Sequence, residues 1–376
     1  MRIGLITTID TNLGDDLVRE GLCSVLRDAF RGRRIEFVSI NKHQPLEVYP
    51  GWHPIRFTHS LARSLPRGRT RLSRGAARML RSLGSSRFDG CDLIVQCGTP
   101  VAWPGCSGCE WAEPLWHQVV GRLSQQGVPA LNLGAGSCYP WEKQPKRVES
   151  EEDALYLKRI SGYCRFTTVR DRLAQLLLES LGRSCPLIPC PALVAGMPVT
   201  GSQGDGDLLV INYMEKGGHY DWGQGIDAGA WSRTAKALVE RVSKRERVLF
   251  LCHDQREYEL ASTLDPTIPR FLPRNLSEYF SVLSRAKAGV CNRLHAAIAL
   301  AGMGIPSVAV GTDTRLLMVE AVGLPYFYVK EATLERMEDA LQGLLRGRES
   351  ERERLLALCE HTRRRYLEVV GKAISS

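Results

Sequence analysis

Long uninterrupted hydrophobic runs are absent from this chain of 376 residues. The longest apolar stretch, Ala296 to Val310, is broken by glycine and proline and is shorter than the ~18 to 20 residues of a membrane-spanning helix. The first apolar stretch, which begins at Ile3, is too short for a secretory signal peptide. We therefore expect a cytoplasmic protein without a transmembrane segment.

Clustered metal-ligand motifs are also scarce, although the chain has 12 cysteines. Cys106 and Cys109 have the spacing of a zinc half-site, but the next candidate pair, Cys185 and Cys190, is far along the chain and differently spaced. Scattered cysteines in a reducing compartment are mostly buried free thiols. The sequence predicts neither a metal site nor a cofactor.

Acidic residues are missing from one long segment, Arg63 to Arg87, which contains eight arginines. Nucleic acid is not the expected partner, because aromatic residues do not alternate with these arginines and no nucleic-acid-binding motif accompanies them. A solvated loop or helix is one interpretation. The other is peripheral contact with an anionic membrane surface or a lipid-linked substrate, which would place the protein at the inner face of the membrane.

The length favours two domains, and the pattern of apolar segments supports them. Short apolar runs alternate with amphipathic segments, stop at a polar, glycine-rich stretch at 198–207, and then resume. Expected strands are 3–9, 35–40, 92–97, 130–133, 166–169, 208–212, 248–252 and 326–329. Expected helices are 15–30, 113–126, 172–181, 230–241, 276–285 and helices between 333 and 371.

This alternation predicts an α/β protein with two doubly wound, Rossmann-like domains that face each other across a cleft. The predicted boundaries are 1–197 for the first domain, 198–207 for a linker, and 208–376 for the second domain. The second domain is expected to include the C-terminal helices.

The segment from Ala288 to Val310 organises the second half. A strand that ends at Cys291, a helix capped by Asn292 and extending to Ala301, and a further strand after Pro306 form a β-α-β unit. Arg293 and His295 are basic residues in a first helical turn, where acidic residues are usual. Together with the free N–H groups of the helix terminus, they predict a site for phosphate or carboxylate. The alternative is a solvated Arg293 and a His295 whose hydrogen bonds are satisfied within the protein.

Other strand ends carry polar residues that the same edge of a sheet would bring together. Asp15 follows the first strand, and Arg170 ends the strand at 166–169. Capping of the first helix is an alternative explanation for Asp15. Trp103, Trp111 and Trp116 follow the third strand and either pack a loop or form the wall of a sugar site.

These motifs resemble, in order, those of the polysaccharide pyruvyl transferase family. The resemblance depends on Asn292-Arg-Leu-His-Ala-Ala-Ile298, on Asn12-x-Gly14-Asp15, on Val169-Arg170-Asp171 and on His253-Asp254. It implies a GT-B-like fold and transfer of the pyruvyl group of phosphoenolpyruvate to two sugar hydroxyls, which forms a ketal and releases phosphate. The implied partners are phosphoenolpyruvate and a polysaccharide or lipid-linked glycan. The resemblance further implies that the first domain lies on the acceptor side and that the second domain holds the donor site.

The resemblance also implies roles for individual residues. His295 and Arg293 are the catalytic candidates, with His295 as the acid that protonates the methylene carbon of the donor. The donor-binding candidates are Arg170, Arg293, Arg315 and Asn292. The acceptor-binding candidates are Asn12, Gly14, Asp15, Gly98 and His253.

The chain departs from the family pattern at several of these positions. Arg315 stands where relatives have lysine, Gly98 stands alone where relatives have several glycines, and Cys190 replaces an aspartate. The base for the acceptor hydroxyls stays open between Asp15 and His253. Two other functions also stay open, a GT-B glycosyltransferase with a nucleotide-sugar donor and an inactive binding protein of the same fold.

Overall fold

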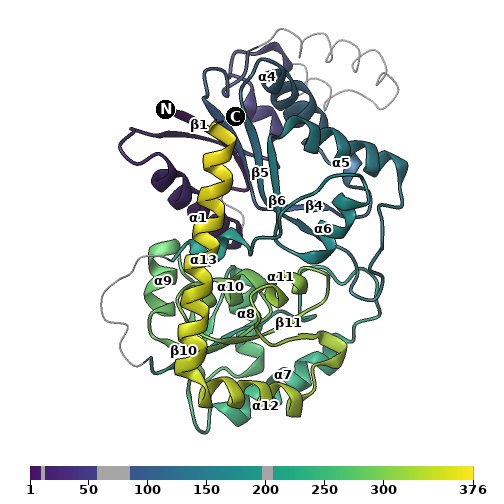
Figure 1. Cartoon of the computed structure of the whole chain (residues 1–376). Coiled ribbons are helices and arrows are strands. Elements are labelled where there is room, and N and C mark those ends of the chain that lie inside the picture. Colours follow the sequence, from purple (N-terminus) through teal and green to yellow (C-terminus); the bar gives the residue numbers. More distant parts are fainter. Residues whose placement is uncertain (10–12, 57–84, 197–205, 376) are drawn as a thin grey trace.

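The computed structural model describes residues 1–9, 13–56, 85–196 and 206–375. Asn12, most of the arginine-rich segment and most of the predicted linker lie outside these residues. The described chain forms two α/β lobes, one above the other, with strands at the centre of each (Figure 1). The predicted fold class, two doubly wound α/β domains, is confirmed.

The N-terminal lobe contains a parallel sheet with the order β2-β1-β3-β5-β4, in which β6 also pairs with β5. Its strands are β1 (Arg2–Thr7), β2 (Glu36–Asn41), β3 (Leu93–Cys97), β4 (Pro100–Ala102), β5 (Ala130–Ser137) and β6 (Phe166–Val169). Every residue of β3 and β5 is buried, as expected for parallel strands covered on both faces. The helical elements are α1 (Leu13–Ala29), η1 (Pro45–Val48), η2 (Cys106–Gly108), η3 (Ala112–Val120), α4 (Gly121–Gln125), α5 (Glu151–Tyr163), α6 (Arg172–Glu179) and η4 (Pro191–Val194).

The C-terminal lobe contains a second parallel sheet with the order β12-β11-β10-β7-β8-β9. Its strands are β7 (Leu208–Asn212), β8 (Arg247–Leu251), β9 (Arg270–Phe271), β10 (Ala286–Cys291), β11 (Ser307–Gly311) and β12 (Tyr326–Tyr328). Its helical elements are α7 (Ala228–Val242), α8 (Gln255–Leu264), α9 (Leu276–Leu283), α10 (Leu294–Gly302), α11 (Leu316–Glu320), η5 (Val329–Glu331), α12 (Leu334–Arg346) and α13 (Arg348–Ser375). The strand order reverses direction between β7 and β10, and ligands bind at such a switch point in open α/β sheets.

The β-α-β unit around α10 has the predicted form, with one correction at its start. Arg293, not Asn292, is the N-cap of α10. The Asn292 carboxamide instead accepts a hydrogen bond from the backbone N–H of Met214 and donates to the carbonyls of Gly217 and Val310. The backbone N–H of Arg293 donates to the Asn212 side chain at the end of β7, so the two switch-point strands fix the helix start together.

The alanines of α10 allow it to lie between the lobes. The helix contacts both η4 and α13, and a Cβ at Gly302 would lie 2.4 Å from the Leu193 carbonyl oxygen of η4. Larger residues on this face would separate the lobes. The small side chains of α10 therefore set how closely its N-terminal end approaches the first lobe.

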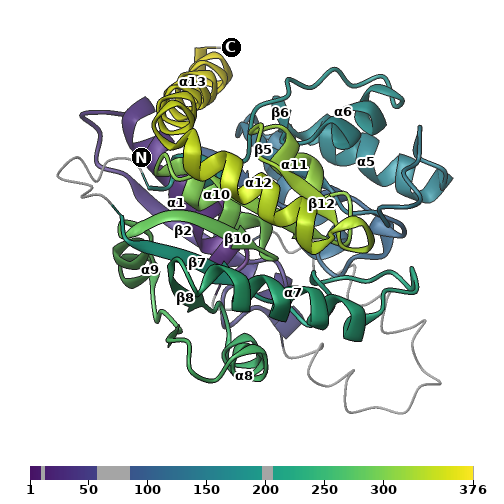
Figure 2. The same ribbon diagram turned by 90° about the horizontal axis from the view of Figure 1, so that it is seen from below.

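Helix α13 also joins the two lobes. Figure 1 shows this long helix running from the lower lobe to the upper one, and Figure 2 shows it at one side of the molecule. It packs on α1 and η4, and its Tyr366 hydroxyl donates to the Pro189 carbonyl. The exact domain boundaries stay a prediction.

The structure adds elements that the apolar pattern did not predict, namely α5, α8 and β9. It also shows that the segment predicted as one helix at 113–126 is a π-helix, η3, followed by α4. All 12 cysteines are free. Among the helices of the described residues, none is both long enough and apolar enough to cross a bilayer.

Candidate active site

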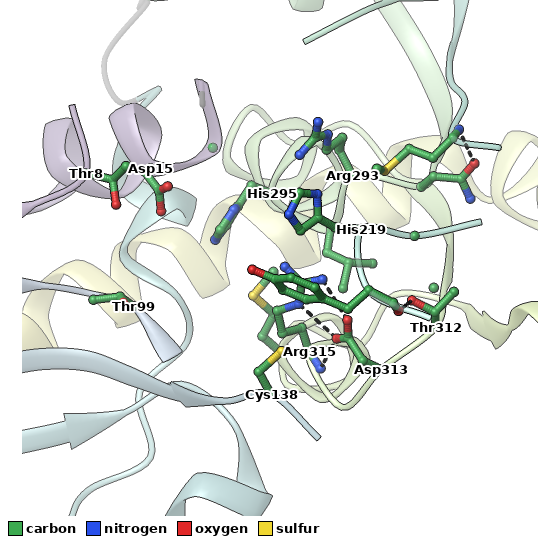
Figure 3. A pocket seen from close by; sticks show the side chains of 18 of the residues that line it. Thr8, Asp15, Thr99, Cys138, His219, Arg293, His295, Thr312, Asp313 and Arg315 are labelled. Carbon is green, nitrogen blue, oxygen red and sulfur yellow. Dashed lines mark hydrogen bonds and ion pairs between the residues drawn. The ribbon is translucent and has the colours of Figure 1, made fainter. Parts of the chain in front are cut away.

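A cavity of about 640 Å³ lies between the two lobes, at the carboxyl ends of both sheets. The N-terminal lobe contributes the residues after β1, β2, β3 and β6, and the C-terminal lobe contributes those after β7, β8, β10 and β11. The predicted residues Arg170, Arg293, His295 and Arg315 all line this one cavity. Figure 3 shows His295 between the N-terminal-lobe residues Thr8, Asp15 and Thr99 and the C-terminal-lobe residues Arg293, His219 and Arg315.

Arg170 is a buried arginine without an ion-pair partner among the described residues. It follows β6 and is only 1% exposed. Its Nη1 donates to the Gly98 carbonyl at 3.2 Å, while its Nε and Nη2 have no hydrogen-bond partner in the described part of the chain. The side chain fits because residue 136 is glycine, where a Cβ would lie 2.6 Å from Nε. Donors buried without partners are costly, and the Arg170 side chain lines a cavity that an anion could enter.

His295 lies next to Arg170, and this contact indicates the protonation state of the His295 imidazole. Arg170 Nη1 and His295 Nε2 are 3.3 Å apart, and a guanidinium can only donate, so Nε2 accepts and the imidazole is neutral. Burial lowers the pKa of His295 well below its usual value, and the positive charges of Arg170 and Arg315 lower it further. Gly14 allows this position, since a Cβ there would lie 2.6 Å from His295 Nδ1.

Arg293 is held by two carboxylates. Its Nε donates to Glu257 at 2.5 Å and its Nη2 donates to Asp254 at 2.8 Å. Glu257 is 3% exposed, and its second oxygen accepts from the Asn212 side chain and from the backbone N–H of His253. Burial raises the pKa of Glu257, and the charge of Arg293 opposes that shift. These contacts use two of the five N–H donors of the guanidinium inside the protein, which the sequence did not indicate.

Arg315 is paired in a similar way. Its Nε and Nη2 donate to the two oxygens of Asp313 at 2.9 and 2.6 Å, and its guanidinium carbon lies 4.9 Å from the centre of the Tyr220 ring. The arginine that stands at the usual lysine position thus has a bidentate partner that a lysine could not match. Arg170 differs from Arg293 and Arg315 because its guanidinium has no carboxylate partner among the described residues.

The remaining predicted residues have different surroundings. His253 lines the cavity, and its Nε2 lies 3.1 Å from the Tyr279 hydroxyl. Burial, reinforced by the charge of Arg293, lowers its pKa to about 3, so it is neutral near pH 7. Asp15 and Gly14 line the cavity from the start of α1, and Gly98 contacts Arg170 through its carbonyl. Asn292 lines the cavity too, but its side chain is engaged in the backbone hydrogen bonds described above.

The sequence interpretation missed Lys42, which follows β2 and lines the cavity. Its Nζ donates to the Thr99 hydroxyl at 2.6 Å and lies 5.1 Å from the centre of the Trp111 ring. Trp103 and Trp111 also line the cavity, with ring centres 5.8 Å apart, whereas Trp116 is 1% exposed in the core. The position of Lys42 at the end of a predicted strand was the signal that could have identified it.

No group of three or more histidine, cysteine or acidic side chains among the described residues could hold a metal ion. Cys106 is buried, and the Cys109 thiol lies 3.3 Å from the Tyr156 hydroxyl. The polar groups of the cavity are mainly guanidinium, imidazole, ammonium and hydroxyl groups, which suit an anion and a polyhydroxylated ligand.

A family model described as polysaccharide pyruvyl transferase matches residues 12–314, which is most of the chain. None of the curated proteins compared with the chain matches it in sequence.

Solved structures share the arrangement of the two lobes. The UDP-GlcNAc 2-epimerase from Neisseria meningitidis bound to UDP-GlcNAc is 9% identical, with a TM-score of 0.54 over 99% of this chain and 100% of that one. The enzyme of the same name from Methanocaldococcus jannaschii, in complex with UDP-GlcNAc and UDP, is 11% identical, with a TM-score of 0.50 over 92% and 93% of the two chains. At these identities the likeness concerns the fold, which is GT-B-like.

Proposed function

The chain belongs to the polysaccharide pyruvyl transferase family, and we propose that its donor is phosphoenolpyruvate. In this proposal the pyruvyl group becomes a ketal on two hydroxyls of a polysaccharide or lipid-linked glycan, and phosphate is released. The observation that carries the proposal is the buried guanidinium of Arg170, which has no ion-pair partner among the described residues and lies beside His295 in the cavity between the lobes.

The donor has a phosphate and a carboxylate on a three-carbon unit. Arg170 offers two donors without partners, and the backbone N–H groups of Leu294 and His295 have no hydrogen-bond partner among the described residues. A planar guanidinium and a helix N-terminus are both suited to such oxygens. Arg293 and Arg315 contribute positive potential, although each already donates two side-chain hydrogen bonds to carboxylates.

His295 is the proposed acid. Protonation of the methylene carbon makes C2 electrophilic, and this step needs a charged imidazole. In the unliganded site the pKa of His295 is lowered by burial and by neighbouring cations. A multiply charged anion next to it would reverse the electrostatic part of that shift and would take over the hydrogen bonds of Arg170. Donor binding would thereby protonate His295 at the stage when the proton is needed.

The acceptor is proposed to lie toward the N-terminal lobe. Trp103 and Trp111 offer flat faces to the apolar side of a sugar ring, and Asp15, Lys42 and Thr99 offer polar groups for its hydroxyls. The identity of the sugar and a location at the membrane stay predictions. The likeness to the UDP-GlcNAc 2-epimerases brings no nucleotide substrate to this chain, because it concerns the fold.

The test combines the purified protein with phosphoenolpyruvate and a panel of nitrophenyl and lipid-linked glycosides. We expect acceptor-dependent phosphate release and a product whose mass increases by a ketal-bound pyruvyl group. His295→Ala should abolish phosphate release while calorimetry still detects donor binding. His361→Ala, an exposed histidine of α13, is the matched control. Unchanged turnover in His295→Ala would remove this residue from the mechanism.

A further inference from the structure

Lys42 is a buried lysine whose charge has no carboxylate partner among the described residues. It is 7% exposed, and its backbone N–H continues the β1–β2 pairing by donating to the Thr7 carbonyl. Its Nζ has one hydrogen bond to a described residue, the Thr99 hydroxyl, and lies over the face of Trp111. An ammonium has three donors, so most of this group's hydrogen-bonding capacity is directed to the cavity that it lines.

The loop after β3 connects Lys42 to the anion end of the site. Thr99 accepts from Lys42 and the preceding residue, Gly98, accepts from Arg170, which in turn contacts His295. The amine and the Arg170 guanidinium are thus held by adjacent residues of one short loop. Lys42 therefore faces the same part of the cavity as the proposed donor site, from the side that carries Trp103 and Trp111.

We propose that Lys42 is the base that accepts the proton of the acceptor hydroxyl that attacks C2. This inference rests on the proposed function and adds to it the catalytic group on the acceptor side. Asp15 lines the same wall, but a free amine is a much stronger base than a carboxylate and is better matched to a hydroxyl proton.

Burial shifts the proton equilibrium of Lys42 toward its neutral form. Burial lowers the pKa of Lys42, the carboxylate of Asp15 on α1 opposes that shift, and the positive charge of Arg170 after β6 adds to it. Cys109, at the end of η2, is a further titratable group that acts on Lys42, and His43, its neighbour in sequence, lines the same cavity. Trp111 and Thr99 bring no charge. An amine here loses its proton more readily than one in water.

The proposed step balances in protons. His295 gives its proton to C3 of the donor while the first hydroxyl oxygen bonds to C2 and its proton passes to the neutral amine of Lys42. The bond between C2 and the phosphate oxygen then breaks, the second hydroxyl oxygen bonds to C2, and its proton goes to the departing phosphate. Transfer of the extra proton from Lys42 to His295, directly or through water, restores both groups.

A different role for Lys42 would be to attract a negatively charged acceptor. Substitution of Lys42 by arginine distinguishes this role from that of a base. Lys42→Arg keeps the positive charge but removes the base, because a guanidinium does not lose its proton near neutral pH. We expect kcat to fall by about 100-fold or more, as for loss of a general base, with the Kd for phosphoenolpyruvate changed less than about threefold. Lys158→Arg, at an exposed position of α5, is the matched control.

Chemical rescue of a second variant, Lys42→Ala, provides an independent test. Lys42→Ala should regain activity with added methylamine, with stronger amines giving faster rates, and should gain nothing from tetramethylammonium, which carries charge but no exchangeable proton. Lys42→Arg with more than a third of the wild-type kcat, or equal rescue by both cations, would overturn the assignment. A wild-type protein that does not bind phosphoenolpyruvate would instead refute the proposed function.

Discussion

Replacing Arg170 by methionine should remove ligand-induced stabilisation without weakening the unliganded protein. Within the described part of the chain, two buried donor nitrogens of Arg170 have no partner, and each such group costs about 1–3 kcal/mol. Methionine fills much of the same volume and removes that cost, which offsets the lost hydrogen bond to Gly98. The melting temperature of unliganded Arg170→Met should therefore be equal to or higher than that of the wild type.

The liganded protein should respond in the opposite way. Phosphoenolpyruvate at 100 times its Kd stabilises the wild type by about 2.7 kcal/mol, or roughly 5–10 °C for lobes of this size. Loss of two charge-assisted hydrogen bonds, about 3 kcal/mol, weakens binding by about 100-fold. The same ligand concentration would then stabilise the variant by only about 0.4 kcal/mol, or ~1–2 °C.

The assay is thermal unfolding of both proteins with and without phosphoenolpyruvate and, separately, inorganic phosphate. Arg293→Met is the contrasting variant, since its guanidinium is already paired with Asp254 and Glu257. Two results would refute the reasoning: an undiminished ligand-induced shift in Arg170→Met, or a large loss of unliganded stability. The second would identify Arg170 as a structural residue of the lobe.

Three further predictions follow from the contacts of the site. Arg293→Met should destabilise the fold by about 3–5 kcal/mol, measured by urea unfolding, because it leaves the buried Glu257 carboxylate without its partner; a milder loss would contradict the buried pairing. Gly14→Ala should reduce turnover at least about tenfold, because its Cβ would displace the His295 ring, whereas Gly343→Ala, with no atom near its Cβ, should keep full activity; equal rates would exclude this constraint. The pKa of His253 is about 3 in the folded protein and about 6.5 in the unfolded chain, so below pH 6.5 only the unfolded chain binds a proton at this residue. The free energy of unfolding should therefore decrease as the pH is lowered from 6.5 toward 3, by up to about 1.4 kcal/mol per pH unit. His253→Gln should flatten this dependence between pH 6 and 4, and an unchanged slope would show that other groups cause it.

The elements that the sequence predicted well have strong local signals. Strand β7 has the predicted bounds, and β10, α10 and β11 are close to theirs, because continuous apolar runs and glycine or proline breaks define them. Helix α8 begins with Asp254 as N-cap and Glu257 three residues later, but its apolar positions are few. Glu257 also holds Arg293 and is buried, and no local sequence pattern reveals this second role of Glu257.

The same distinction explains what could be known of the site. That basic residues would gather at strand ends followed from the topology of parallel sheets. The topology did not indicate which of these basic residues would lack a carboxylate partner, because Arg293 is paired with residues 36 and 39 positions away in the sequence. Asp313 lies two positions before Arg315 and could have been read as its partner. Lys42 was missed because a lysine after a strand is ordinarily solvent-exposed, and only the packing of Trp111 and Thr99 makes it buried.

A continuous polar connection sets the relation between the arginines of the two lobes. Asp171, next to the arginine of the first lobe, accepts hydrogen bonds from the backbone and side chain of Ser137. The Ser137 hydroxyl lies 3.0 Å from that of Thr314, whose backbone N–H donates to the Tyr139 carbonyl across the lobe boundary. Thr314 follows Asp313, which holds the arginine of the second lobe. Ser137 and Thr314 are fully buried, so sliding the lobes apart at this edge would leave polar groups without partners, at about 1–3 kcal/mol each. The spacing of the cationic groups is therefore fixed before a ligand arrives, and a donor whose two anionic groups match that spacing would bind without ordering the site first.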